Sequence, residues 1–326
     1  TEASGLYEAR LGAEEMPDGE VHVFCAAYRD DEMDELLRYA DHIVFNSPAQ
    51  LAKFGAKVKA AGKSVGLRIN PECSTQDGHA IYDPCAPGSR LGTTRAAWDA
   101  AVAQNPALPQ LLDGLHFHTL CEQDADALAV TLDAVTEKFG DILPKMQWVN
   151  FGGGHHITRP GYDLETLEHC IARAQNAWGV TVYLEPGEAC ALNAGYLLTR
   201  VLDVVQNGGT TVAILDASAA CHMPDVIEMP YRPPLLFAGD VGQKPCTVRL
   251  AGPTCLAGDV IGDYSLDAVP RAGDLLVFGD MAIYTTCKNN TFNGMPLPAI
   301  CVRDEAGHVR ELVKFGYRDF KARLGR

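Results

Sequence analysis

Short apolar runs alternate with amphipathic segments along the chain as far as about residue 195. The runs are rich in β-branched and aromatic residues, which predicts buried strands, and the segments between them carry apolar residues every three or four positions, which predicts helices. The predicted strands are 21–25, 42–45, 65–69, 114–119, 147–151 and 180–184. The predicted helices are 31–39, 48–61, 94–104, 124–139 and 164–178. Regular alternation of this kind predicts a parallel sheet.

A seventh strand is predicted at the start of the chain, because the segment from Thr1 looks like the end of a strand that runs straight into a helix. A (β/α)8 barrel of the TIM type needs eight strands, and its active site lies at their C-terminal ends. The count is one short, and we expect the missing first strand to precede Thr1. An open doubly wound sheet is the alternative, although no Gly-x-Gly-x-x-Gly sequence opens this chain.

The pattern changes from about Gly195, where the apolar runs are separated by Gly, Pro and Asp turns. Strands are predicted at 197–206, 210–216, 244–251, 274–279 and 299–303. Such a series is typical of a β-sandwich or barrel. We therefore predict two domains, a (β/α)8 barrel over residues 1–196 and a β domain over residues 197–326.

Composition narrows the class of protein. The chain has 326 residues, 47% of them hydrophobic, and a formal charge of −15. No apolar run approaches the ~20 residues of a membrane span and no signal-peptide pattern opens the chain, so we expect a soluble, cytoplasmic protein without a membrane partner. The negative charge argues against a nucleic-acid partner and mildly favours a cationic substrate. The 11 cysteines include no Cys-x-x-Cys pair, which indicates reduced thiols and no metal site.

Two strand ends carry candidate chemistry. Three glycines, Gly152, Gly153 and Gly154, follow the strand 147–151, and glycines at such a place let backbone N–H groups face a phosphate. An ordinary strand-to-helix turn is the alternative interpretation. Further along, the strand 180–184 ends in the carboxylate of Glu185. A phosphate cradle and an acid on neighbouring strand ends suggest a phosphorylated cofactor with a basic ring nitrogen, and pyridoxal 5'-phosphate (PLP) fits that description.

An α/β barrel followed by a β domain, with a glycine triplet and Glu-Pro-Gly, resembles the fold-type III PLP enzymes, which include alanine racemase and the ornithine and diaminopimelate decarboxylases. Six segments resemble one family of this group, the carboxynorspermidine (carboxyspermidine) decarboxylases. These segments are 81–92, 115–122, 184–189, 222–233, 252–259 and 315–320. Together they extend over nearly the whole chain.

The resemblance implies roles for the cofactor ligands. His118 would stack on the pyridine ring, the glycine triplet would hold the phosphate, and Tyr284 would reach the phosphate from the β domain. Glu185 would keep the pyridine nitrogen protonated, because an opposite charge raises the pKa of that nitrogen. Alanine racemases have an arginine there, so Glu185 favours decarboxylation over racemisation.

The resemblance also implies a general acid from a partner subunit. Cys255, in the sequence Gly-Pro-Thr-Cys, would reprotonate the substrate carbon after CO2 departs, and Asp259 would help to bind the substrate beside it. Because the relatives supply this cysteine across the subunit interface, we expect an obligate homodimer with shared active sites.

Two departures from the ornithine decarboxylase pattern point to the substrate. Glu188 stands where those enzymes have an arginine that assists the phosphate, and Leu256 replaces an acid after the cysteine. Both fit a carboxylated polyamine, whose amines need carboxylates. The candidate substrate ligands are Glu188, Asp225 and Glu228, and a solvated loop face is an equally open interpretation of the last two.

One expected residue is absent from the sequence. Enzymes of this group hold PLP on a lysine at the end of the first barrel strand, and none of the lysines here follows such a strand. We expect that lysine to lie in a segment before Thr1. The predicted activity is PLP-dependent decarboxylation of carboxynorspermidine or carboxyspermidine to norspermidine or spermidine in polyamine biosynthesis. The alternatives are a carboxy-lyase of the same group acting on diaminopimelate or ornithine, and a non-catalytic, lysine-less homologue that acts by binding partners.

Overall fold

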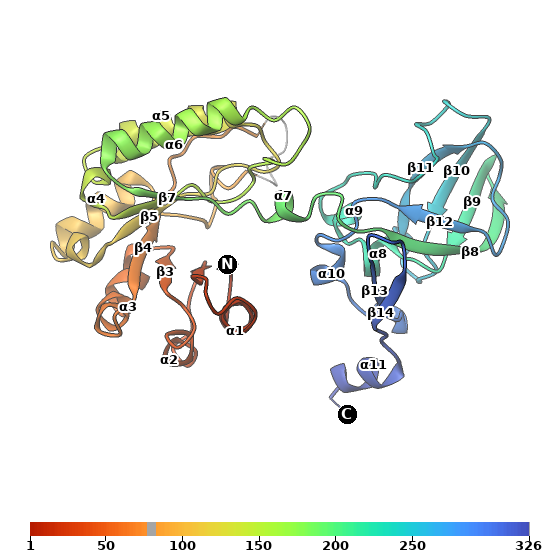
Figure 1. Cartoon of the computed structure of the whole chain (residues 1–326), viewed down its shortest axis with the longest axis horizontal. Helices are drawn as coiled ribbons and strands as arrows, with labels where there is room; N and C mark the ends of the chain where they lie inside the picture. Colours follow the sequence, from red (N-terminus) through yellow and green to blue (C-terminus); the bar gives the residue numbers. More distant parts are fainter. Residues whose placement is uncertain (77–82, 326) are drawn as a thin grey trace. The chain divides into compact units, whose positions relative to one another are not determined.

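The computed structural model describes residues 1–76 and 83–325. The chain forms two compact units, Thr1–Cys190 and Ala191–Arg326 (Figure 1). The boundary expected from the sequence, between residues 196 and 197, lies just inside the second unit. In the described part of the chain, no helix combines the length and the apolar character needed to cross a bilayer.

One parallel sheet of seven strands forms the centre of the first unit, and the strands have the same order in the sheet as in the sequence. The seven predicted strands are all present. They are β1 (Glu2–Ala3), β2 (His22–Cys25), β3 (His42–Phe45), β4 (Ser64–Arg68), β5 (Gly114–His116), β6 (Trp148–Asn150) and β7 (Thr181–Tyr183). A doubly wound sheet reverses its strand order partway, so this continuous order excludes that alternative and supports the predicted barrel-type architecture.

The sheet is strongly curled. β1 and β7 are the two ends of the strand order, yet the hydroxyl of Tyr183 on β7 donates to Glu20, just before β2, at 3.2 Å. The ring of His22 on β2 also lies 4.6 Å from that of Tyr183, centroid to centroid. Side chains from opposite ends of the sheet therefore meet in its interior, as they do in a barrel.

Helices connect the strands and cover the outer face of the sheet. They are α1 (Leu6–Glu15), α2 (Met33–Leu36), α3 (Pro48–Ala60), α4 (Arg95–Gln104), α5 (Ala125–Phe139), α6 (Leu164–Trp178) and α7 (Gly187–Ala191). Figure 1 shows α5 and α6 side by side above the strands. Ser47 caps α3 by accepting from the N–H of Gln50.

The helix predicted at 31–39 is too long. It is helical only over α2, because the chain tightens after Leu36 into three-residue turns. The N–H of Arg38 bonds to the carbonyl of Glu35, and that of Tyr39 to the carbonyl of Leu36. Such i→i+3 bonds are how helices commonly end.

Trp148 fills the interior at the N-terminal ends of the strands. Its ring lies over two glycines of neighbouring strands, and a Cβ on Gly114 would come within 2.1 Å of it, while a Cβ on Gly66 would come within 2.5 Å. The indole N–H donates to the hydroxyl of Ser64 at 2.8 Å. The two glycines weaken their strands in principle, and here they make room for this ring.

The second unit contains a mixed five-stranded sheet in the order β11-β10-β9-β8-β12 and a separate hairpin, β13-β14. The strands are β8 (Leu197–Asn207), β9 (Thr210–Leu215), β10 (Cys246–Ala251), β11 (Val260–Leu266), β12 (Leu275–Phe278), β13 (Ile300–Arg303) and β14 (Val309–Val313). The sequence did not predict β11 and β14. Gly262 and Asp263 interrupt the apolar pattern of β11, and every residue of β14 is exposed.

Short helices occupy the connections of the second unit. They are α8 (Ala219–His222), α9 (Asp225–Glu228), α10 (Thr285–Lys288) and α11 (Tyr317–Arg323). The core under the five-stranded sheet is formed by buried residues of all five strands, among them Val248, Leu250, Tyr264 and Phe278. The polar residues predicted to act in chemistry lie outside this core, on the connections.

Candidate active site

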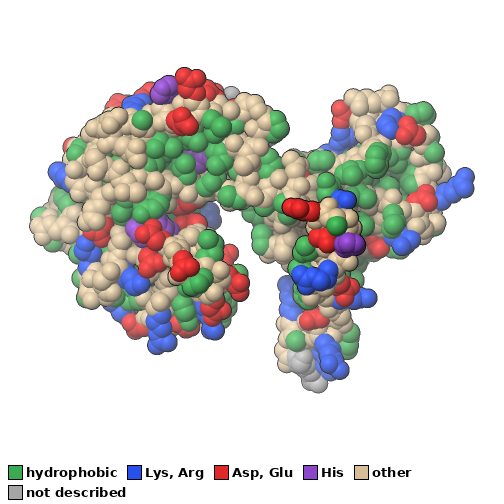
Figure 2. Space-filling model, viewed as in Figure 1, with side chains coloured by type: hydrophobic (Ala, Val, Ile, Leu, Met, Phe, Trp, Pro, Cys, Tyr) green, Lys and Arg blue, Asp and Glu red, His purple; other side chains and the backbone are tan. Residues whose placement is uncertain are grey.

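A cavity of about 940 Å³ opens in the first unit. The chemically important side chains in its wall lie at or just after the C-terminal ends of consecutive strands, where a barrel carries its active site. They are Arg68, His116, His118, Asn150 and Glu185. Figure 2 shows histidine and acidic side chains together in a hollow of the first unit.

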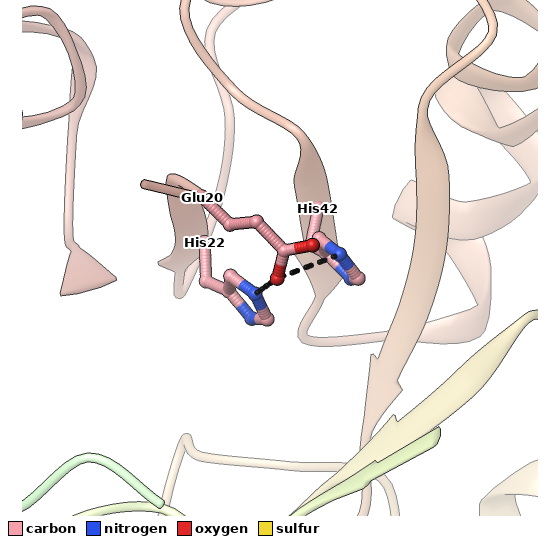
Figure 3. Close-up of side chains that lie close together, drawn as sticks. All are labelled: Glu20, His22 and His42. Atoms are coloured by element: carbon pink, nitrogen blue, oxygen red, sulfur yellow. Dashed lines mark hydrogen bonds and ion pairs between the residues drawn. The ribbon is translucent and has the colours of Figure 1, made fainter. Parts of the chain in front are cut away.

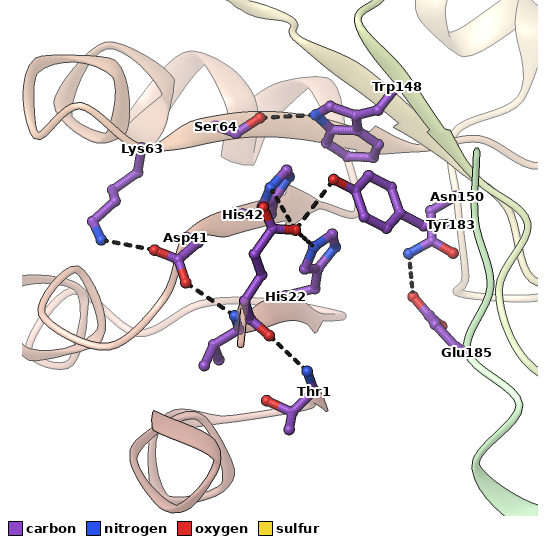
Figure 4. Close-up of polar contacts among 12 residues, drawn as sticks. Thr1, His22, Asp41, His42, Lys63, Ser64, Trp148, Asn150, Tyr183 and Glu185 are labelled. Atoms are coloured by element: carbon purple, nitrogen blue, oxygen red, sulfur yellow. Dashed lines mark hydrogen bonds and ion pairs between the residues drawn. The ribbon is translucent and has the colours of Figure 1, made fainter. Parts of the chain in front are cut away.

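Glu185, the predicted partner of the cofactor nitrogen, is held as an anion. Asn150 donates to its Oε1 at 2.6 Å (Figure 4). Nε2 of His116 lies 3.2 Å from the same oxygen. Burial raises the pKa of Glu185, but the nearby His116 and His118 and these hydrogen bonds outweigh it and hold the pKa well below its usual range. The structure thus provides a fixed negative charge at the end of β7.

Glu2 forms a carboxyl pair with Glu185. Burial raises the pKa of Glu2 far above its usual range, and the negative charge of Glu185 raises it further. Two interacting carboxyl groups cannot readily both be charged, so one of the two keeps its proton. Glu2 carries that proton and donates to Glu185, which keeps the negative charge on Glu185.

The glycine triplet lies beside His118. Gly152 and Gly154 have φ angles of +74° and +79°, which favour glycine. A Cβ on Gly154 would come within 2.2 Å of the carbonyl of Leu120, and one on Gly153 within 2.8 Å of the carbonyl of Glu185. The N–H of Gly153 donates to Nδ1 of His118 at 3.3 Å. The structure therefore brings together all the cofactor residues predicted in the first unit.

The imidazole ring of His118 is held in its neutral form. Burial and the positive charge of Arg68 together lower its pKa to about 4. A neutral imidazole carries no charge that would oppose a pyridinium ring stacked on it.

The sequence did not single out Arg68, His116 and Asn150. The guanidinium of Arg68 is buried over the ring of Phe24, 4.5 Å from its centroid, and donates to the backbone carbonyl of His118 at 3.1 Å. Burial lowers the pKa of Arg68 to about 10. Each of these three residues is a polar group at the end of an otherwise apolar strand, which is the signal that could have identified it.

A second polar group lies at the N-terminal ends of β2 and β3 (Figure 3). It consists of Glu20, His22 and His42. Nε2 of His22 is 3.3 Å from Oε2 of Glu20, and Nε2 of His42 is 3.8 Å from it. Each residue offers a ligand atom, and these atoms lie within 4.8 Å of one another. The two rings, however, stack 3.9 Å apart and 11° from parallel. Because an imidazole lone pair lies in the ring plane, the two nitrogens do not converge on one ion. The group is a stacked pair of histidines, of which His22 is hydrogen-bonded to Glu20.

Cys255 lies in the second unit, on the turn between β10 and β11, and is exposed. Its backbone N–H donates to Oδ1 of Asn293 at 2.8 Å. The thiol is therefore accessible while the backbone that carries it is fixed.

Asp259, predicted to help bind the substrate, is 3% exposed and anchors this turn. Its carboxylate accepts from the hydroxyl of Ser218 at 2.9 Å and from the hydroxyl of Thr254 at 2.6 Å. The backbone N–H of Ala220 adds a third hydrogen bond, at 3.3 Å. These partners connect the turn before Cys255 to α8.

The other predicted residues of the second unit surround Lys288. Asp225 and Glu228 on α9 both form ion pairs with its ammonium group. Tyr284, at the start of α10, has a φ of +51° and a half-exposed ring. Glu188 belongs to α7 of the first unit, and its neighbours Gly187 and Cys190 line the cavity.

Comparison with known proteins identifies the family. The model of the family "pyridoxal-dependent decarboxylase, C-terminal sheet domain" matches residues 24–282. The chain belongs to the pyridoxal-dependent decarboxylases. It is 42% identical to the carboxynorspermidine/carboxyspermidine decarboxylase of Campylobacter jejuni, over 98% of this chain and 84% of that protein. It is 41% identical to the carboxyaminopropylagmatine decarboxylase of Synechocystis, over 99% of this chain and 82% of that protein.

The fold of this decarboxylase matches a solved relative. The crystal structure of carboxynorspermidine decarboxylase from C. jejuni complexed with norspermidine superposes with a TM-score of 0.86 at 41% identity. The match covers 99% of this chain and 85% of that one. These comparisons confirm the predicted fold class, the family and the decarboxylase type of the enzyme.

The cofactor of the family is PLP, and the residues present fit it. The glycine triplet leaves no space for side chains, so only its backbone can border a bound phosphate. Glu185 is an anion suited to a protonated ring nitrogen. No lysine is found among the described residues that line the cavity. The residues Ile81 and Tyr82 of the first matching segment lie outside the described residues.

Proposed function

We propose that this decarboxylase converts carboxynorspermidine or carboxyspermidine to norspermidine or spermidine in polyamine biosynthesis. The two relatives above support a carboxylated polyamine as substrate, since both are named for one. The solved relative was crystallised with norspermidine, the product expected here.

The anionic carboxylate of Glu185 is the observation that carries the proposal. When bound, PLP supplies the electron sink that accepts the electron pair left by departing CO2. Glu185 holds a proton on the pyridine nitrogen, which makes that sink effective. A site with a cationic side chain at this position would leave the ring neutral.

The remaining residues of the first unit bind and orient. The glycine triplet would border the phosphate, and the neutral ring of His118 would contact the face of the cofactor. Arg68 fixes the backbone of His118 by donating a hydrogen bond to its carbonyl group. Tyr284 of the second unit is proposed as a further phosphate ligand, on the strength of the resemblance.

Cys255 is proposed as the general acid that returns a proton to the substrate carbon. Its exposed thiol and fixed backbone support this role. We propose that it acts in the active site of a partner subunit, in a homodimer with shared sites.

Carboxylates are proposed to bind the substrate amines. Glu188 lies next to the cavity wall, and Asp225 and Glu228 already bind an ammonium group, that of Lys288. For Asp259, the buried hydrogen-bonded carboxylate supports a role through the Cys255 turn more than a direct contact with the substrate.

Carboxyaminopropylagmatine is the second candidate substrate, because a relative at 41% identity is named for it. It ends in a guanidinium group in place of an ammonium group. Diaminopimelate and ornithine are weaker candidates, since a diaminopimelate decarboxylase relative is 27% identical over 73% of this chain.

The test is a substrate panel with the full-length protein and PLP. CO2 release and amine product are measured for carboxynorspermidine, carboxyspermidine, carboxyaminopropylagmatine, diaminopimelate and ornithine. We expect the highest kcat/KM for one of the first two. A higher kcat/KM for carboxyaminopropylagmatine would establish the second candidate, and turnover of diaminopimelate or ornithine alone would refute both.

A further inference from the structure

A lysine of the second unit occupies the carboxylates proposed for the substrate amines. The ammonium of Lys288 bonds to Oδ1 of Asp225 and lies 3.2 Å from Oε2 of Glu228. It also lies 5.2 Å from the centroid of the Tyr284 ring. Asp225 and Glu228 belong to α9, Lys288 belongs to α10, and Tyr284 directly precedes α10.

These surroundings keep the lysine charged. Burial lowers the pKa of Lys288, but the hydrogen bonds and charges of Asp225 and Glu228 outweigh burial and raise it. The side chain of Asp225 is only 13% exposed. A carboxylate this enclosed depends on a nearby cation, and Lys288 supplies it.

The same groups suit the ammonium of a polyamine. Two carboxylates and an aromatic face are what a primary ammonium ion needs in a protein site. Lys288 carries the same –NH3⁺ donor as the end of a norspermidine chain. An ammonium group of the substrate must therefore displace or share the position of the lysine.

We propose that Lys288 is a specificity-determining residue that competes with polyamine ammonium groups for Asp225 and Glu228. The inference rests on the proposed function for the identity of the ligand. With two carboxylates and one ammonium, the group keeps a net charge of −1. Lys288 thereby limits how tightly a polycation is held, and it favours release of the product, which has lost the substrate carboxylate and is more cationic.

The test measures norspermidine binding by isothermal titration calorimetry with the full-length, PLP-loaded protein. Lys288→Met keeps the length of the side chain and removes its charge, and we expect it to bind norspermidine about tenfold more tightly, or about 1.4 kcal/mol. Lys288→Arg keeps the charge and should stay within about threefold of wild type. The double variant Lys288→Met/Asp225→Asn should lose the gain.

Lys244→Met is the matched control. Lys244 is a lysine of the same unit, similarly exposed and paired with Asp267 at 2.9 Å. It should leave norspermidine affinity unchanged, which separates competition at α9 from the general effect of one less positive charge. Equal or weaker binding by Lys288→Met would overturn the proposal, as would an equal gain in Lys244→Met.

The binding result is valid only if the Lys288→Met variant is folded. Thermal melting confirms that Lys288→Met is folded, and Lys288→Gln replaces it if it is not, with the same expected gain. Binding is measured without turnover, so the outcome does not depend on the assay of decarboxylation. The enzyme could turn over no carboxylated polyamine in the substrate panel while Lys288→Met binds norspermidine more tightly. That outcome would support the competition by Lys288 and refute only the proposed reaction.

Discussion

The two units present their functional groups in opposite ways. In the first unit, Arg68 is buried and Glu185 is largely enclosed at strand ends, and neighbours such as Asn150 fix them. In the second, Cys255 and Tyr284 are exposed on a turn and a short helix. A buried charge fixed in a rigid sheet acts by its permanent field, whereas an exposed thiol acts by reaching a reacting atom. This difference fits the roles proposed above, electrostatic for the first unit and proton delivery for the second.

The largest effect is expected from removing the fixed charge. Glu185→Gln keeps the shape of the side chain and loses its charge, so the electron sink weakens. We expect kcat to fall about 1,000-fold, or about 4 kcal/mol, in a steady-state assay of CO2 release. Glu168→Gln, an exposed acid on α6, is the control and should retain wild-type kcat. A fall of less than about tenfold for Glu185→Gln would show that its charge is not central.

The effect of removing the proposed proton donor of the second unit, Cys255, should be smaller. Cys255→Ala removes the thiol, and kcat should fall about 100-fold, within the range for a lost general acid. Cofactor affinity, measured by titration of PLP absorbance, should stay unchanged because the cofactor residues of the first unit are untouched. Cys301→Ala, another exposed cysteine of the same unit, provides the control. Equal losses in both variants would contradict a specific role for Cys255.

The rigidity of the first unit can be tested at the glycine triplet. Gly154→Ala meets both a φ of +79° and a backbone contact of 2.2 Å, and we expect a loss of about 3 kcal/mol in unfolding free energy. Gly161→Ala has a φ of +83° with nothing within 4 Å, so it should lose only about 1 kcal/mol. Urea unfolding compares the two. Equal losses of unfolding free energy in the two variants would mean that the close backbone contact at Gly154 does not destabilise an added side chain.

Acid should weaken the first unit through its histidine pair. Burial lowers the pKa of His42 to about 4 and also lowers that of His22. A histidine with a depressed folded-state pKa binds protons more readily when unfolded, so stability is lost as pH falls from about 6.5 towards 4. We expect His42 to contribute about 1 kcal/mol to this loss. Urea unfolding between pH 7.5 and 4.5 should show a smaller loss in His42→Asn, and an unchanged loss would contradict this account.

The sequence predicted the first unit better than the second. Six strands of the curled sheet follow short apolar runs, so periodicity located them, and β1 was predicted because the segment from Thr1 looks like a strand end that runs into a helix. Glu185 and the glycines stand out where the apolar runs end. The partners of Glu185 were missed because the contact of His116 and Asn150 with it joins strands that are distant in the sequence. Local pattern carries no information on such pairs.

The second unit shows a different limit. β11 and β14 were missed because polar residues and Gly262 break their apolar pattern. Asp225 and Glu228 were predicted as substrate ligands, but their pairing with Lys288 on α10 could not be foreseen, because it depends on how two loops fold together. The motif around Cys255 identified the thiol, and only the structure showed Asp259 anchoring its turn.

The most direct test of the central claim is product analysis with carboxynorspermidine. The full-length protein with PLP should release one CO2 for each norspermidine formed, and Glu185→Gln should bind PLP yet lose that turnover. Wild-type protein that binds PLP but releases no CO2 from any carboxylated polyamine would contradict the account.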